Sequence, residues 1–302
     1  GLLSELDWYR AYKTPYEQAC IKEANRISVG GHHAAREAFM AGASEFEIQW
    51  AFQKGCQQDY HELAYHSLVC VNEHAAIAHY SHYEKKRHPW GNLRSLLIDA
   101  GASYNGYCSD ITRTYAYQEG LFSELIIAFD EMQQEIVDSI AVGQRQVDIN
   151  ITALMKMAKL LNTFGVLKMS PEAAIETGVI CKFMYHTFGH FLGIQVHDVG
   201  GEQKDVTGEK VDIDPAYPNL REPFRRTRML EADQVITVEP GLYFVDGLMK
   251  QLAESEHRND ICWEKIEQLK PCGGMRIEDN ILIKKEGVEN LTRAAFDAHA
   301  AA

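Results

Sequence analysis

The sequence lacks any apolar run long enough to cross a bilayer, and it lacks an excess of basic residues. A membrane-spanning helix needs about 20 consecutive, mostly apolar residues, and no run here approaches that length. Lysine and arginine number 30 against 43 aspartate and glutamate residues, which gives a formal net charge of −13. The missing apolar run argues against a membrane partner. Because binding to a phosphate backbone requires a basic surface, the acidic net charge argues against a nucleic-acid partner.

Cysteine motifs and targeting signals are also missing. The seven cysteines are odd in number and include no C-x-x-C pair, which argues against a disulfide framework or a cysteine-based zinc site. The N-terminal stretch has no basic region followed by an apolar core, so it does not resemble a secretion signal. We therefore expect reduced thiols and a cytoplasmic location. The chain does not begin with Met, so we expect an upstream segment to have been removed or to lie outside it.

What is present is typical of a folded globular protein. Hydrophobic residues make up 46% and charged residues 24% of the 302 positions, a balance that allows a sizeable core. The chain shows no internal repeat, low-complexity tract or clear linker. We expect a single α+β domain over residues 1–302, with helices packed on a curved antiparallel sheet.

The expected elements follow from caps and periodicity. Capping boxes at Thr14–Glu17 and Ser44–Glu47 predict two helix starts. The pattern predicts helices at about 15–42, 44–55, 122–141, 148–163 and 171–177, and loops at 82–92 and 202–229. It predicts a strand, a turn and a second strand within 67–80, and further β-type segments at 95–117, 181–198, 234–245 and 273–285.

Two aspartates in one expected hairpin, LLIDAGASYNGYCSDITRTYA at 96–116, carry the first functional hint. Asp99 ends the first apolar run, and Asp110 lies in the second. A desolvated carboxylate in a strand costs several kcal/mol unless it is compensated. One explanation is a turn residue and an exposed residue. The other is two metal ligands that lie side by side on neighbouring strands and point to one face.

Three further segments carry polar groups within apolar runs. HTFGHFLGIQVHD at 186–198 contains three histidines, TVEPGLYF at 237–244 contains Glu239, and GGMRIEDN at 273–280 contains Arg276 and Glu278. Each is weak alone, because Glu239 fits a simple strand end and Glu278 fits a strand salt bridge. Together, four carboxylates and one imidazole would balance two divalent cations with a bridging hydroxide. An oxygen-rich set with one histidine favours Mn²⁺ and permits Co²⁺ or Zn²⁺.

Five other residues have two open interpretations. They are Tyr65, His79, His186, His197 and Arg276. Each either packs in the core or pairs locally, or it contacts a substrate. The histidines would donate hydrogen bonds to a substrate oxygen or a tetrahedral oxyanion, and Arg276 would bind a substrate carboxylate or only orient Glu278. Thr112, two residues after Asp110, is a candidate for orienting a ligand.

These segments together resemble the pita-bread metallopeptidases, the family of prolidases, aminopeptidase P and methionine aminopeptidases. The four motifs DAGASYNGYCSDITRT, HTFGHFLGIQVHDVG, TVEPGLYF and GGMRIEDN appear in the family's order and with similar separations. The resemblance covers residues 8–291. Within the family, the segments WYRAYKTPYE, VNEHAAIAHY, REPFRRTRML and WEKIEQLKPCGGMRIEDN are most like those of bacterial Xaa-Pro dipeptidases, including the organophosphorus acid anhydrolases.

The resemblance implies a pita-bread fold, a dinuclear metal centre and specific residue roles. The implied metal ligands are Asp99, Asp110, His190, Glu239 and Glu278. Asp110 and Glu278 would bridge the two ions. The implied catalytic residues are His79, His186, His197, Glu239 and Arg276, and the implied substrate-binding residues are Tyr65, His79, His197 and Arg276.

The resemblance also implies an activity and an assembly. We expect hydrolysis of Xaa-Pro dipeptides by a homodimer, with organophosphate hydrolysis as a possible side reaction. The alternatives are an aminopeptidase P-type exopeptidase and a pita-bread binding module without metal. The family's smaller N-terminal domain does not appear in this chain, which leaves open whether the chain is active as it stands.

Overall fold

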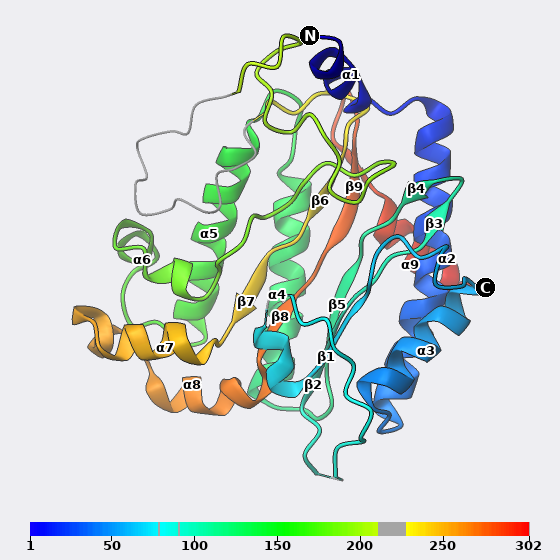
Figure 1. Cartoon of the computed structure of the whole chain (residues 1–302). Helices are drawn as coiled ribbons and strands as arrows, with labels where there is room; N and C mark the ends of the chain where they lie inside the picture. Colours follow the sequence, from blue (N-terminus) through cyan, green and yellow to red (C-terminus); the bar gives the residue numbers. More distant parts are fainter. Residues whose placement is uncertain (78, 90, 211–227, 302) are drawn as a thin grey trace.

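Antiparallel strands occupy the centre of the molecule, and helices cover them (Figure 1). The computed structural model describes residues 1–77, 79–89, 91–210 and 228–301. The helices are α1 (Leu2–Arg10), α2 (Pro15–Met40), α3 (Glu45–Cys56), α4 (Leu121–Asp138), α5 (Gln146–Thr163), α6 (Pro171–Glu176), α7 (Asp246–Ala253), α8 (Trp263–Leu269) and α9 (Leu291–Ala300). The strands are β1 (Leu68–Val71), β2 (Ser95–Asp99), β3 (Ser103–Tyr104), β4 (Tyr107–Cys108), β5 (Thr112–Ala116), β6 (Val235–Val238), β7 (Gly241–Tyr243), β8 (Gly274–Arg276), β9 (Asp279–Ile283) and β10 (Val288–Asn290).

Two three-stranded antiparallel sheets meet at one point. The first has the order β1-β2-β5 and the second the order β10-β9-β6. In the first sheet Asp99 lies opposite Thr112, and an isolated bridge then joins Thr112 to Glu278, just before β9. The strand ends that carry acidic residues in the two sheets are therefore brought together. The expected α+β class with antiparallel sheets is confirmed.

Helices α2 and α3 begin where the sequence predicts. The side chains of Thr14 and Ser44 accept hydrogen bonds from the backbone three residues on, and both capping boxes are complete. The two helices come very close at Gly30 and Gly55. A Cβ atom on Gly55 would lie 2.5 Å from the carbonyl oxygen of Gly30, so this crossing requires glycine.

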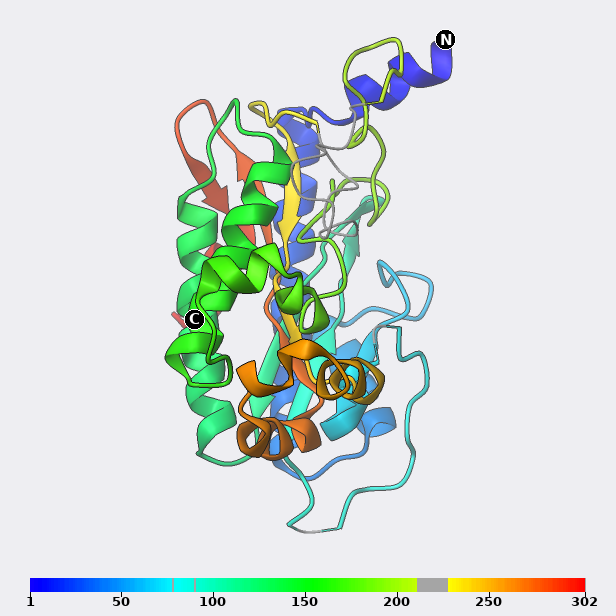
Figure 2. The same ribbon diagram turned by 90° about the vertical axis from the view of Figure 1, so that its left-hand side faces the viewer.

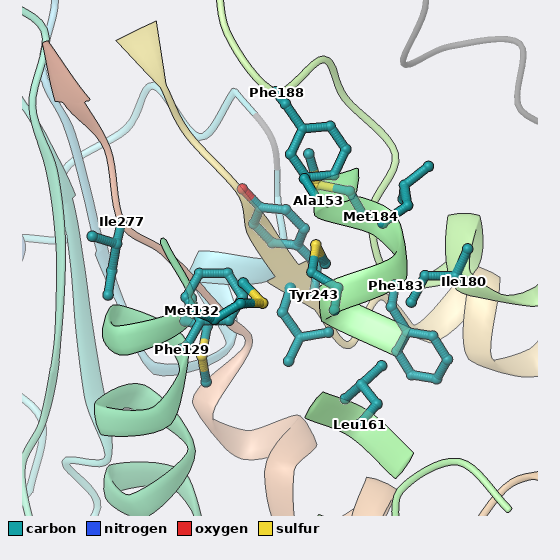
Figure 3. Close-up of a cluster of buried hydrophobic side chains, with 14 of the residues drawn as sticks. Phe129, Met132, Ala153, Leu161, Ile180, Phe183, Met184, Phe188, Tyr243 and Ile277 are labelled. Carbon is teal, nitrogen blue, oxygen red and sulfur yellow. The ribbon is translucent and has the colours of Figure 1, made fainter. Parts of the chain in front are cut away.

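A large hydrophobic core joins α4 and α5 to the second half of the chain. Figure 2 shows these two helices on one side of the strands. Phe129 from α4, Leu161 from α5 and Phe183 pack in the same core cluster as Tyr243 of β7 (Figure 3). The Tyr243 residue is only 1% exposed, so its ring lies in the core while its hydroxyl remains available for polar partners.

The prediction of a second strand within 67–80 was wrong. After β1 the chain forms a short 3₁₀ helix, η1 (Asn72–Ala76). Asn72 has φ of 59°, a left-handed conformation that ends a strand and that asparagine tolerates better than most residues. Its side chain binds the backbone of Arg94 and Asn92, which fixes this turn against the start of β2.

The β-type prediction for 181–198 was also wrong in detail. The segment begins with the 3₁₀ helix η2 (Val179–Lys182) and continues without a regular strand. Residues 188–192 still run beside β6, because Thr237 donates to the carbonyl of His190 at 2.8 Å and Glu239 donates to that of Phe188 at 2.9 Å. At Gly189 a Cβ would lie 2.0 Å from the Thr237 carbonyl oxygen, so this close approach requires glycine.

Other differences concern short helices and loops. Helices α1, α7, α8 and α9 were not expected from the sequence. Residues 211–227, within the predicted loop 202–229, and residue 78 lie outside the described residues. All seven cysteines are free. Within the described part of the chain, no helix has both the length and the apolarity that crossing a membrane requires.

A buried histidine in α2 predicts acid sensitivity. The ring Nε2 of His32 donates to the Ala100 carbonyl at 3.0 Å, and burial lowers its pKa from 6.5 to about 3. The unfolded chain takes up the proton first, so this stabilisation is complete above pH 6.5 and is lost as the pH falls toward 3. We expect His32→Gln to reduce the acid-side slope of the unfolding free energy by about 1 kcal/mol per pH unit, measured by urea unfolding.

The matched control is His61→Gln, at an exposed position. Its slope should equal that of the unsubstituted protein. Equal slopes for the unsubstituted protein and His32→Gln would contradict the prediction.

Candidate metal centre

The five predicted metal ligands come from four separate parts of the fold. Asp99 is the last residue of β2, and Asp110 lies two residues before β5. Glu239 follows β6 directly, and Glu278 links β8 to β9. His190 lies on the extended segment beside β6. Asp99 pairs with Thr112 across the sheet, the chain between the two aspartates forms the small hairpin β3-β4, and the Tyr65 hydroxyl contacts both carboxylates.

Three of the five form a compact buried group. One donor atom each from Asp110, His190 and Glu278 lies within 4.8 Å of the others. All three residues are at most 4% exposed. The distance from His190 Nε2 to Asp110 Oδ2 is 3.2 Å. Two carboxylates and an imidazole at this spacing could hold a divalent cation.

The other two predicted ligands, Asp99 and Glu239, adjoin this group. Glu239 Oε1 lies 3.4 Å from Nε2 of His190. Asp99 reaches the group through Tyr65, whose hydroxyl contacts Asp99 Oδ1 and Asp110 Oδ1, each at 2.5 Å. The structure thus brings all five together. Tyr65, expected as a substrate-binding residue, is also within this cluster.

The Nε2 atom of His190 faces the carboxylates and carries no proton. Its Nδ1 lies 3.0 Å from the backbone carbonyl of Phe191, which can only accept, so Nδ1 carries the proton. Nε2 is then the bare nitrogen, as in most histidine metal ligands. Thr237 holds the residue in place by accepting from the His190 backbone N–H at 3.0 Å and donating to Glu239 Oε1 at 3.2 Å.

Desolvation raises the pKa of the clustered carboxyl groups. It raises the pKa of Asp99 to about 6 and that of Glu239 to about 8. The pKa of Asp110 also rises, and that of Glu278 rises well above its usual range because the neighbouring carboxylates add to the effect of burial. So many acidic groups in one place favour either bound protons or bound cations. The residues therefore fit a divalent-metal centre.

Two polar side chains, those of Thr112 and Asn280, hold Glu278 and Asp110 in place. The Thr112 hydroxyl donates to Glu278 Oε2 at 2.6 Å and accepts from Nε of Arg276 at 3.1 Å. Thr112 was expected to orient a ligand, and the structure places it on Glu278. The side chain of Asn280 accepts from the Asp110 backbone N–H at 3.0 Å and donates to the Asp110 carbonyl. It thereby takes the place of a neighbouring strand for Asp110.

Arg276 and His186 share one buried tyrosine. Arg276 donates to the Tyr243 hydroxyl at 2.7 Å and to Asp99 Oδ2 at 2.5 Å. The Tyr243 hydroxyl lies 2.8 Å from His186 Nε2, and His186 Nδ1 donates to the Thr187 carbonyl at 2.7 Å. Burial and the nearby guanidinium lower the pKa of His186 to about 3. His186 is therefore neutral, and both of its nitrogens have partners.

The two remaining histidines are exposed at the edge of the cluster. The ring of His197 lies 4.4 Å from that of His190, edge to face. Repulsion from His79 is the smallest of the contributions that shift the pKa of His186. Both are placed where a bound molecule could meet them.

Sequence reasoning missed Thr237, Tyr243 and Asn280. Asn280 gave a weak signal, because it interrupts the apolar alternation of its strand. Thr237 and Tyr243 gave none, since both occur in an ordinary β-type run and their partners lie far away in the chain.

The fold and the cluster define a class of protein. A family model, metallopeptidase family M24, matches residues 19–285, and the chain belongs to this family. Its structure resembles that of zinc-substituted Escherichia coli aminopeptidase P in complex with product, with a TM-score of 0.74 and 26% identity over 97% of this chain and 61% of that one. Proline aminopeptidase P II from Yersinia pestis gives a TM-score of 0.72 at 26% identity, over 96% of this chain and 59% of that one. The predicted pita-bread fold is confirmed.

Among curated relatives the similarity is higher. The Xaa-Pro dipeptidase of Aeromonas hydrophila is 46% identical over 295 residues, which is 98% of this chain and 66% of the relative. That of Shewanella amazonensis is 44% identical over 97% of this chain and 65% of the relative. The chain thus spans about two thirds of the length of these relatives. The predicted resemblance is confirmed.

The raised pKa values predict that cation binding releases protons. Glu239, with its pKa raised to about 8, is largely protonated at neutral pH, and a cation would displace that proton. We expect Mn²⁺ affinity to rise with pH, and calorimetry in buffers of different ionisation enthalpy should detect the released protons. Glu278→Gln should weaken binding at least about a hundredfold.

The control for this prediction is Glu62→Gln, at an exposed position outside the cluster. It should bind Mn²⁺ normally. A pH-independent affinity, or normal binding by Glu278→Gln, would show that the ion binds elsewhere.

Proposed function

We propose that this chain is the catalytic part of a dinuclear-metal Xaa-Pro dipeptidase, which releases a C-terminal proline. The observation that carries the proposal is the convergence of Asp110, His190 and Glu278 within 4.8 Å, with Asp99 and Glu239 adjoining them. The relatives named Xaa-Pro dipeptidase support this specificity.

The donor set supports the assignment of the ions. Asp99, Asp110, His190, Glu239 and Glu278 would hold the two ions, with Asp110 and Glu278 serving both, Asp99 one, and His190 with Glu239 the other. Four carboxylates with one imidazole favour Mn²⁺ and permit Co²⁺ or Zn²⁺. When bound, such ions lower the pKa of water and polarise the scissile carbonyl.

The protein's own residues divide into two groups. Glu239 would accept a proton from the attacking water and pass it to the prolyl nitrogen. His197 and His79 are exposed and would contact the substrate. Arg276 is 6% exposed and already donates to Asp99 and Tyr243, so its contacts support an orienting role over direct binding of the substrate carboxylate.

The orienting group also includes His186. Its two nitrogens are engaged by Tyr243 and Thr187, so an oxyanion contact would require it to exchange a partner. Tyr65 faces both aspartates and would line the pocket beside them.

We further propose a cytoplasmic location, since free thiols are maintained in a reducing compartment. We also propose that the protein forms a homodimer, and that the same centre hydrolyses organophosphates as a side reaction.

The proposal predicts a shared loss of metal and activity in Asp110→Asn. Removing a bridging carboxylate should abolish binding of at least one ion and reduce the turnover of Ala-Pro and Leu-Pro by about a thousandfold or more. Metal analysis and a dipeptidase assay with Mn²⁺ measure the two effects. Asp297→Asn, on the exposed side of α9, is the control and should behave as the unsubstituted protein.

Turnover of these dipeptides by Asp110→Asn at the normal rate would refute the assignment. A metal-free binding module would instead show no ion after purification without chelator, and no activation by Mn²⁺.

A second candidate activity is supported by the aminopeptidase P structures. An enzyme of that type would cleave a tripeptide Xaa-Pro-Xaa at the bond before proline. The same assay with Ala-Pro and Ala-Pro-Ala separates the two, because a dipeptidase should strongly prefer the shorter substrate.

A further inference from the structure

One buried carboxylate outside the metal centre accepts an unusual number of hydrogen bonds. Glu45, the first residue of α3, is 1% exposed. Its four donors all lie in one short stretch of chain. They are the Val71 backbone N–H at 2.8 Å, His74 Nδ1 at 2.7 Å, the Tyr80 hydroxyl at 3.0 Å and the Glu84 backbone N–H at 2.8 Å.

These donors use the full accepting capacity of the carboxylate. Oε1 takes the N–H of Val71 and the ring of His74, and Oε2 takes Tyr80 and the N–H of Glu84. An ionised carboxylate offers about four lone-pair sites. An amide at this position would turn an NH₂ group toward a backbone N–H, whichever way it was oriented. Only a carboxylate satisfies all four donors.

The stretch that Glu45 holds borders the metal centre. The Ala76 carbonyl accepts from the Tyr185 hydroxyl at 3.2 Å, and the Tyr185 ring packs 4.9 Å from that of Tyr243. His79 lies in the same stretch, next to Tyr80, and is exposed. The ends of the stretch are therefore tied to α3, and its middle contacts Tyr185, which packs on Tyr243.

Two further contacts make this connection rigid. The rings of His74 and Tyr80 stack 4.3 Å apart with an interplanar angle of 21°. The backbone N–H of Phe46 donates to the Glu84 carbonyl at 3.1 Å, so Glu84 is bound to α3 twice. A movement of the stretch would break several of these contacts together.

We propose that Glu45 is a positioning residue that holds His79 at the edge of the metal centre for substrate binding. The proposal rests on the proposed function in that His79 contacts the peptide. The competing explanation is that Glu45 only stabilises α3 and the chain around it. If the proposal holds, replacing Glu45 changes substrate binding only by displacing His79. If the competing explanation holds, the effect of replacing Glu45 does not depend on His79.

A double-mutant cycle on the Mn²⁺-loaded protein separates these explanations. Glu45→Gln and His79→Ala should each raise KM for Leu-Pro about tenfold with a smaller effect on kcat. The double variant should be within about twofold of His79→Ala alone, because the positioned group is already gone. Losses that multiply, or an unchanged KM in Glu45→Gln, would overturn the proposal.

The matched control is Glu47→Gln, in the same helical turn. Glu47 caps α3 through the Ser44 backbone N–H and pairs with Arg87 at the surface. This variant should lose helix stability without a change in KM. If Glu45→Gln fails to fold, Tyr80→Phe removes a single donor and keeps the ring. Tyr80→Phe should raise KM by a smaller factor than Glu45→Gln does. When His79→Ala is already present, Tyr80→Phe should not raise KM further.

Hydrogen–deuterium exchange tests positioning without any reaction. In Glu45→Gln, faster exchange should be confined to residues 71–84, and Glu47→Gln should not show it. If the unsubstituted protein is inactive but Glu45→Gln shows this confined change in exchange, the proposed function is refuted and the positioning role is retained. Exchange that accelerates across α3 and the sheets would overturn the positioning role whatever the activity.

Discussion

The crowding of carboxyl groups at one buried point is the constraint on which the rest of this structure depends. Asp99, Asp110, Glu239 and Glu278 share a volume in which desolvation raises the pKa of each. Such a cluster is stable only if positive charge or protons compensate it. Arg276 supplies one buried positive charge from within the fold, and bound cations would supply the rest.

A set of buried ion pairs next to the cluster holds these groups together. Arg113 donates to the carbonyls of Thr112 and Glu278, each at 2.8 Å, and to Asp279 at 2.7 Å. Arg293 binds the other oxygen of Asp279 at 2.8 Å. These arginines lower the pKa of Asp279 to about 2 despite its burial. The adjacent acidic residues Glu278 and Asp279 therefore have different environments. Asp279 is neutralised by arginines, whereas Glu278 faces the carboxylate cluster.

Much of the fold and the site could be predicted from local sequence. Capping at Thr14 and Ser44 is decided by residues three apart, so the starts of α2 and α3 were visible. The acidic residues at strand ends stood out because strands rarely carry them. The second strand after β1 was predicted wrongly, because the left-handed turn at Asn72 depends on contacts with residues around 92–95. Short helices such as α7 and α8 lack strong caps and depend on packing.

The sequence by itself determined which residues could form the centre and, through family M24, the fold that carries them. It did so because carboxylates and histidines in apolar runs are costly unless they have a shared purpose. Only the tertiary structure decided their supports. Asn280 takes the place of a strand beside Asp110, Tyr243 joins Arg276 to His186, and Glu45 gathers the stretch that carries His79. These partners lie far apart in the chain, and no local pattern records which distant groups will meet.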